Sequence, residues 1–454
     1  MKIIRLMTGL VFLICLGSIN SYAQGLQKPK APSLNNYSTF VLFGDEAYEE
    51  RDYYGAYVYF GKALKADSTS LDLRYKYASS LRQYNAYNKA LKGYQDLYNI
   101  DKGQEFPESL YWLATMQKSN GQYDEARKSY MDFASASEAK GGFLHEKAKH
   151  EVKSCEYAME MNKDQASVEI SNLGNQVNSS SSEFSPILAN DSVLYFSSLR
   201  PKYRDSRKTI TDVGSIIKIY KAEKTNYGVW KMIGALDTTI NQSIRHSANG
   251  SLSPDKKRLY FTRCSEDNVC IIYVSSLMDG IWEKPVKLNS DINQEGSTAT
   301  QPMVAMVHGE EVLFFVSDRK RGEGKLDIWY SILSFEDKIK YSKAKPIAGG
   351  VNSKGNEISP YYDSGSNTLY FSSSWHYGYG GFDIFKSYGS YKRFTLPENL
   401  GHPYNSIAND IYFSIHTSGT NGFFASNRSE SFAIEGEICC NDIYNFSINE
   451  PIDP

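Results

Sequence analysis

An apolar strand that ends in small polar residues recurs five times in the C-terminal two-thirds of this 454-residue chain. Its copies are Leu194–Ser198, Leu259–Arg263, Leu313–Ser317, Leu369–Ser373 and Gly422–Ser426. Their third residue advances by 65, 54, 56 and 53 positions, so each copy belongs to a unit of similar size. Such a period is typical of arrays and propellers, in which neighbouring units bury one another's apolar faces. The strands lack polar–apolar alternation, which predicts burial on both faces.

Further positions recur around this strand. A second β run follows it, at Lys218–Tyr220, Ile271–Tyr273, Asp327–Trp329, Asp383–Phe385 and Asp442–Tyr444. An Asn precedes it, at Asn178, Asn241, Asn293, Asn352 and Asn405, and four units have an upstream Pro, at Pro186, Pro254, Pro302 and Pro360. Asn and Pro favour turns and strand entries, so they mark where each unit starts. Each unit is predicted to hold an inner, an aromatic, an Ile-aromatic and an outer strand.

The count of outer strands predicts how the units close. Four units have their own, at Trp230–Leu236, Lys284–Asn289, Lys345–Gly350 and Lys392–Leu396. The fifth unit has only three strands, and Val168–Leu173, ahead of the first unit, can supply the fourth. Pairing of the two ends seals a ring and removes an exposed edge. We therefore predict a closed five-bladed β-propeller over residues 164–449, followed by a tail at 450–454.

The N-terminal third has helical periodicity instead. Small and aromatic residues repeat at helix-hairpin spacing, as Ala56, Phe60 and Ala63, then Ala90, Tyr94 and Leu97, then Ala126, Tyr130 and Phe133. Steps of 34 and 36 residues with this pattern indicate tetratricopeptide repeats, and an amphipathic segment over 144–161 is the expected cap. The predicted fold class is multidomain α+β: an all-α tetratricopeptide-repeat solenoid over 38–163, followed by the all-β, WD40-like propeller.

The first residues have the pattern of an export signal. Lys2 and Arg5 precede an apolar run that ends near a small-x-small site at Ser21–Ala23. This pattern predicts a cleaved signal peptide over 1–23, a linker over 24–37 and a periplasmic protein. Cys15 lies within the run, but Ile14 precedes it where a lipoprotein site needs a small residue.

Charge and cysteine content narrow the function classes. The chain without Lys2 and Arg5 has 48 basic and 52 acidic residues, so no nucleic-acid partner is expected. Cys264 and Cys270 flank a predicted hairpin turn and either form a disulfide there or remain two thiols. Cys155 is expected to pack in the capping helix, and of the adjacent Cys439 and Cys440 the unstrained arrangement is one free and one buried residue.

The motifs of metal and nucleophilic chemistry are missing from the sequence. It has no CxxC, HExxH, GxSxG or phosphate-binding loop, so no metal or cofactor is expected. Five-bladed propellers can host glycoside hydrolysis, and Glu183, Glu357 and Asp410 each fall five residues after a blade-opening Asn. Their equivalence favours a structural role as hydrogen-bond acceptors for the neighbouring turn, because a catalytic pair should break the repeat. We therefore predict that the chain is not an enzyme.

Loops on one face of the propeller are the predicted partner-binding surface. In a four-stranded blade, the loop between the second and third strands and the connection between blades emerge on the same face. The candidates there are Arg200, Arg204, Arg207, Arg319, Arg321, Trp375, Tyr377 and Tyr379. Arg and aromatic residues are enriched at interface anchors, although long polar loops are also often simply solvated. A solenoid groove that takes a helix or an extended peptide is a second candidate.

The order of these regions resembles a known family, the periplasmic TPR/WD40-like/OmpA proteins of Bacteroidota that include PorE-like type IX secretion components. The resemblance rests on the LYFSS-type strands, the Asp-Ile-aromatic strands and the ending Cys439–Asp442. Members typically continue into an OmpA-like peptidoglycan-binding domain, whereas this chain stops at Pro454, so binding of peptidoglycan through this chain alone is not expected.

The resemblance implies a periplasmic scaffold at the inner face of the outer membrane. Its expected partners are an outer-membrane β-barrel of the PorP/SprF-like type and other components of secretion or gliding machinery. A carbohydrate- or peptidoglycan-binding module that uses the aromatic loop Trp375–Tyr379 as a stacking platform is the alternative. Stacking on sugars would require these rings to be exposed and not paired with protein. The third hypothesis for the function is a glycoside hydrolase.

Overall fold

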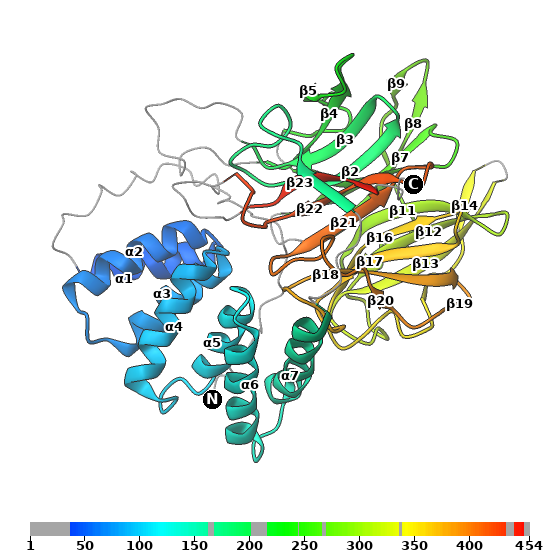
Figure 1. Cartoon of the computed structure of the whole chain (residues 1–454). Coiled ribbons are helices and arrows are strands. Elements are labelled where there is room, and N and C mark those ends of the chain that lie inside the picture. The colour runs from blue at the N-terminus through cyan, green and yellow to red at the C-terminus, as the bar shows by residue number, and fades with distance from the viewer. Residues whose placement is uncertain are drawn as a thin grey trace, which may run out of the picture.

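The computed structural model describes residues 37–161, 168–200, 216–243, 245–265, 269–335, 338–432 and 440–448. A helical solenoid lies against a ring of β-sheets (Figure 1). The predicted signal peptide, nearly all of the linker and the tail at 450–454 fall outside the described residues.

The solenoid consists of three helical hairpins and a final helix. The helices are α1 (Tyr37–Glu49), α2 (Tyr53–Ala66), α3 (Leu71–Gln83), α4 (Tyr87–Asp101), α5 (Ser109–Lys118), α6 (Tyr123–Ser137) and α7 (Phe143–Met161). The aromatic residues predicted between the helices, Phe60, Tyr94 and Tyr130, are buried. Gly44 lies against Phe60, and a Cβ there would be 2.5 Å from Cε1 of the ring, so a small residue is required where these helices cross. No helix among the described residues is long and apolar enough to cross a membrane.

The five sheets are the predicted blades. Blade one contains β2 (Glu183–Asn190), β3 (Val193–Ser198), β4 (Lys218–Lys224) and β5 (Trp230–Ala235). Blade two contains β6 (His246–Leu252), β7 (Arg258–Cys264), β8 (Cys270–Met278), β9 (Ile281–Trp282) and β10 (Val286–Lys287). Blade three contains β11 (Ala299–Val307), β12 (Glu310–Ser317), β13 (Asp327–Phe335), β14 (Ile339–Tyr341) and β15 (Lys345–Pro346). Blade four contains β16 (Glu357–Asp363), β17 (Thr368–Ser373), β18 (Asp383–Ser390), β19 (Arg393–Phe394) and β20 (Glu398–Asn399).

Blade five closes the ring with the two ends of the domain. Its strands are β21 (Asp410–Ile415), β22 (Asn421–Ser426), β23 (Asp442–Ile448) and β1 (Val168–Asn172). Strand β1 pairs antiparallel with β23 from Val168 opposite Ile448 to Asn172 opposite Tyr444. The predicted five-bladed propeller and its closing strand are therefore confirmed.

The outer strands differ from the prediction in length and, in blade four, in position. The strand in blade one has six residues, but β10, β15 and β20 have two each. In blade four the predicted segment Lys392–Leu396 contains β19, which only extends a hairpin with the end of β18. The outer strand is instead β20, where Asn399 lies opposite Phe385.

Each blade-opening Asn joins its blade to the preceding one. The side chain of Asn293 accepts a hydrogen bond from Ile272 N at 2.8 Å and donates to Ile272 O at 2.9 Å, as a strand residue would. The same two bonds join Asn241 to Ile219, Asn352 to Ile328, Asn405 to Ile384 and Asn178 to Ile443. The last pair links the first blade to the fifth and is a second closure of the ring.

Candidate functional site

Arg319, a predicted partner-binding residue, is built into blade three. It is 5% exposed, and its guanidinium lies 4.8 Å from the ring centroid of Phe315 and 5.2 Å from that of Trp329. It donates hydrogen bonds to the carbonyl oxygens of Asp291, at 2.9 Å, and Ile292. Burial lowers the pKa of Arg319 to about 10. The side chain thus holds the aromatic strands to the loop that opens the blade.

The same arrangement recurs in the other blades. An arginine lies over an aromatic pair in three of them, as Arg200 over Phe196 and Tyr220, Arg263 over Phe261 and Tyr273, and Arg428 over Phe424 and Tyr444. In blade four, His376 makes edge contacts with Phe371 and Phe385 instead. Each also bonds the carbonyl before its blade-opening Asn, at Val177, Ile240, Val351 and Tyr404. A role of Arg200 and Arg319 in partner binding stays a prediction, and both side chains are already engaged within their blades. Sequence analysis missed the other three, although each follows the Phe of an aromatic strand within five residues.

The three equivalent carboxylates have hydrogen-bond donors around them, as expected for structural acceptors. Glu357 is fully buried and accepts from Ser353 N at 2.7 Å, Ser353 Oγ at 2.5 Å and Ser373 Oγ at 2.7 Å. Burial outweighs these bonds and raises the pKa of Glu357 to about 8. Glu183 and Asp410 accept from the corresponding serines and also pair with an arginine, Arg200 at 2.9 Å and Arg428 at 2.6 Å.

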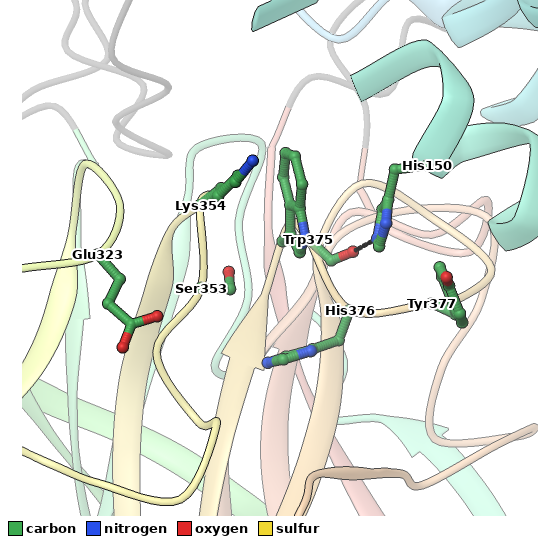
Figure 2. Close-up of a pocket in the computed structure, with 7 residues that line it drawn as sticks. All are labelled: His150, Glu323, Ser353, Lys354, Trp375, His376 and Tyr377. Carbon is green, nitrogen blue, oxygen red and sulfur yellow. Dashed lines mark hydrogen bonds between the residues drawn. The ribbon is translucent and has the colours of Figure 1, made fainter. Parts of the chain in front are cut away.

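The aromatic loop of blade four is occupied by the solenoid. Trp375 stacks on the ring of His150 of α7 with centroids 4.6 Å apart, and Lys147 Nζ lies 4.7 Å from the Trp375 ring centroid. Tyr377 also contacts His150, with centroids 4.6 Å apart. Figure 2 shows the His150 ring directed at the Trp375 carbonyl oxygen, to which it is hydrogen-bonded. The condition for sugar stacking is therefore not met at Trp375.

Backbone atoms of this loop bond α7 and α6 directly. Ser154 Oγ donates to Gly378 O at 3.0 Å and accepts from Gly378 N at 3.1 Å. Tyr123 OH donates to the carbonyl of Tyr379, which is itself 3% exposed. The Ser154 hydroxyl bonds both backbone polar groups of Gly378, so the loop is fixed to the solenoid in one register.

A buried ion triad lies behind this contact. Glu151 of α7 pairs with Lys118 of α5 and Lys147 of α7, with both N···O distances at 2.7 Å. Lys147 Nζ also donates to Ser374 O at 2.6 Å, and Lys118 Nζ to Ser154 Oγ at 3.0 Å. The triad therefore connects two helices to the propeller. We call the contacts of α7 with residues 374–379, together with this triad, the junction.

A cavity of about 380 Å³ opens beside the junction (Figure 2). Its lining consists of His150, Glu323, Ser353, Lys354, Trp375, His376 and Tyr377. Burial, followed by the charge of Lys147, lowers the pKa of His150 to about 4, so this ring is neutral at pH 7. Within the described ranges, no group of three His, Cys, Asp or Glu side chains is arranged to hold a metal ion.

The remaining predicted residues lie elsewhere. Arg321 is exposed in the loop between β12 and β13, and Arg204 and Arg207 lie outside the described residues. Cys264 and Cys270 form a disulfide across the β7–β8 hairpin. Cys440 is disulfide-bonded, so it is neither the free nor the merely buried thiol that was expected, while Cys439 lies outside the described residues. Cys155 is a buried thiol.

The solenoid has its own aromatic and basic surface. The guanidinium of Arg82 in α3 stacks on Trp112 of α5 at 3.7 Å and donates to Tyr94 OH at 3.1 Å. Tyr48 of α1 and Tyr53 of α2 make an edge contact with centroids 5.3 Å apart. Except for Tyr94, these side chains are half-buried, and they come from three successive hairpins.

Comparison with known proteins identifies fold relatives only. No family model and no curated protein matches the chain. Among solved structures, CoXyl43, a GH43 β-xylosidase/α-arabinofuranosidase from a compost metagenome, matches at 12% identity over 62% of this chain and 94% of that chain, with a TM-score of 0.40. An α-L-arabinofuranosidase of Clostridium thermocellum matches at 16% identity over 54% and 81%, with a TM-score of 0.36. The TPR2B domain of yeast Sti1 matches at 15% identity over 27% and 96%, with a TM-score of 0.24.

These matches correct one prediction. The statement that the chain is not an enzyme is contradicted, because the five-bladed propellers that match it include several GH43 glycoside hydrolases. At these identities the likeness concerns the fold alone, so it assigns no activity to this chain.

Proposed function

We propose that the chain is a scaffold that binds a protein partner through the surface of Arg82 and Trp112 on the solenoid. The stacking of this pair is the observation that carries the proposal. Arg and Trp are the residue types most enriched among interface hot spots, and a stacked guanidinium is pre-organised for binding. Tyr48 and Tyr53 provide rigid aromatic area on neighbouring helices, with little side-chain entropy to lose.

The junction supports a scaffold because it fixes the solenoid to the propeller. Side chains of α7 bond backbone groups of blade four at Ser374, Trp375 and Gly378. Buried, mutually hydrogen-bonded groups of this kind define a single arrangement, since a half-satisfied network is costly. A partner held by Arg82 and Trp112 is therefore held at a fixed position relative to the propeller loops.

The proposed location is the periplasm, peripheral to the outer membrane. The predicted export signal and the resemblance to PorE-like proteins support this location. They also support an outer-membrane β-barrel of the PorP/SprF-like type as the partner, within type IX secretion or gliding machinery. Exposed Arg321 is a second candidate contact on the propeller.

The test is affinity isolation of the tagged full chain from native envelopes, with quantitative mass spectrometry. We expect stoichiometric recovery of an outer-membrane β-barrel, reduced about tenfold or more by Trp112→Ala and by Arg82→Ala. The control is Tyr227→Ala, which removes a 94% exposed aromatic residue from the β4–β5 turn of blade one. Circular dichroism melting checks that each variant is folded.

Two results would contradict the proposal. Recovery of the folded wild-type chain alone would show that it binds no such partner. Equal recovery of the partner by the wild type and both solenoid variants would show that binding uses another surface.

A further inference from the structure

The inner strand of each blade has a β-bulge at the same place. The pairing register shifts after Phe184, Ala248, Thr300, Ile358 and Ile411. The next residue is left-handed in every blade, with φ between 50° and 57°, at Ser185, Asn249, Gln301, Ser359 and Tyr412. None of these is Gly, the residue that adopts this conformation at no cost. All five line one cavity, so the bulges bring their side chains together at the centre of the ring.

The floor of this cavity is a hydrogen-bonded plug. Tyr412 OH donates to Asn249 Oδ1 at 2.8 Å, and because blade one lies between blades five and two, this bond crosses the channel. Asn249 Nδ2 donates to Thr300 Oγ1 at 3.3 Å, and Gln301 Oε1 accepts from Ser359 N at 2.5 Å. The cavity is therefore closed at one end.

Two polar atoms of the lining have no hydrogen bond within the described chain. Ser185 is 6% exposed and Gln301 is 9% exposed, yet no partner is present for Ser185 Oγ or for Gln301 Nε2. Neither atom is among the fully buried unpaired atoms of the described chain, so both face the open cavity. The Ser185 hydroxyl, which can donate and accept a hydrogen bond, and the Gln301 amide NH2, which can donate, therefore remain available to a ligand.

The walls and the rim set the size and charge of that ligand. The cavity measures about 260 Å³, below the roughly 300–1,000 Å³ of sites for drug-sized ligands. Four prolines, Pro186, Pro254, Pro302 and Pro360, line it together with Met303 and Phe413.

Charged side chains occur in its lining only at the hairpins that join first to second strands, as Asp191 and Lys256. His416 pairs with Asp191 at 3.0 Å across the closure of the ring. These hairpins lie at the strand ends opposite the junction, so the solenoid does not cover the mouth.

We propose that this cavity binds one neutral sugar residue at the end of a glycan. Hydroxyl and amide groups on the floor match neutral hydroxyls, whereas the charged end of a peptide would be buried there without a counter-ion. Apolar walls take the faces of one ring, and the open mouth lets the rest of the glycan continue past Asp191 and His416. The proposal is independent of the protein-binding surface on the solenoid.

The test is saturation-transfer NMR of the full chain with two probe sets. One contains glucose, galactose, xylose and N-acetylglucosamine, and the other contains neutral tripeptides blocked at both ends. We expect saturation of at least one sugar and of no peptide. Ser185→Ala and Gln301→Glu should each weaken the affinity for that sugar about fivefold, since each removes one hydrogen bond. The matched control, Ser192→Ala, removes an exposed hydroxyl from the neighbouring hairpin and should leave the affinity unchanged.

Should the floor variants not fold, Met303→Trp fills the cavity from its half-buried wall and is expected to abolish the signal. No signal from the wild type with any sugar would overturn the proposal. Signals unchanged in the folded floor variants, or in Met303→Trp, would also overturn it. Saturation of the peptides alone would assign the cavity to a polypeptide instead.

Discussion

Substitution of Glu151 by Gln tests whether the buried triad fixes the solenoid to the propeller. The variant keeps the shape of the side chain but leaves the ammonium groups of Lys118 and Lys147 buried without a counter-ion. Both lysine side chains are about nine-tenths buried, so solvent screens them little. Removal of one partner from a buried pair costs about 3–5 kcal/mol. We therefore expect local opening of α7 to become about a hundredfold more frequent, or more.

Hydrogen exchange followed by mass spectrometry measures this opening for peptides of α7. The matched control is Glu146→Gln on the same helix, which breaks an ion pair of the same length, 2.7 Å, with Lys354 of the propeller. Those two side chains are more than half exposed and screened by solvent, so the control should leave the exchange of α7 nearly unchanged. Equal protection of α7 in Glu151→Gln and in the wild type would refute the reasoning, as would an equal loss in the control.

The pH dependence of the same opening follows from the pKa of Glu151. Burial alone would raise this pKa, but the charges of Lys118 and Lys147 outweigh it and lower the value from 4.5 to about 2. The ionised carboxylate therefore stabilises the junction fully above pH 4.5, and this contribution is lost as the pH falls towards 2. Hydrogen exchange of α7, corrected for the intrinsic rate, should accelerate in the wild type as the pH falls from 4.5 towards 2. In Glu151→Gln, which lacks the carboxylate, the exchange should not show this acceleration.

Three further predictions concern the propeller. Asn178→Ala removes the side-chain acceptor of the buried Ile443 N–H and one of two donors to Ile443 O, which still accepts from Leu173 N at 3.1 Å, so urea unfolding should show a loss of about 1–3 kcal/mol. An unchanged midpoint would contradict this. Arg319→Glu should prevent folding and Arg321→Glu should not, as circular dichroism will show; a folded Arg319→Glu would contradict the stacked arrangement. Glu357, whose pKa is raised to about 8, destabilises the fold as the pH rises from 4.5 to 8, so Glu357→Gln should flatten the dependence of the unfolding free energy on pH in that range.

The sequence was sufficient to predict the repeated parts of the fold. Apolar strands with a fixed spacing identify blades, and a leftover strand at Val168–Leu173 identifies the closure, because both depend only on the order of local elements. The outer strand of blade four was misplaced because Lys392–Leu396 and Glu398–Asn399 are equally compatible with a short edge, and tertiary contact with Phe385 decides between them.

The candidate site could not be predicted to the same degree. Arg319 was assigned to the surface because an arginine in a loop is usually solvated, whereas its stacking on Phe315 and Trp329 depends on two strands that are separate in sequence. The junction joins His150 to Trp375 across 225 positions, and no local pattern indicates which loop a helix will contact. No sequence pattern indicated Ser185 or Gln301, because a bulge in an inner strand is visible only in how its residues pair with the neighbouring strand.

Blade four, which forms the junction with α7, departs from the arrangement shared by blades one, three and five. In blades one, three and five, the residue whose N–H bonds the serine at the end of the aromatic strand is Arg200, Arg319 or Arg428. In blade four it is Trp375, which bonds Ser373 Oγ at 3.0 Å in the same way. The next residue, His376, takes the place of the arginine: it contacts Phe371 and Phe385 edge-on, and its shorter side chain still reaches the Val351 carbonyl at 2.9 Å. The Trp375 side chain is therefore not needed inside the blade and stacks on α7. The junction thus depends on a Trp at the position of the arginine, and His376 compensates for the missing arginine within the blade.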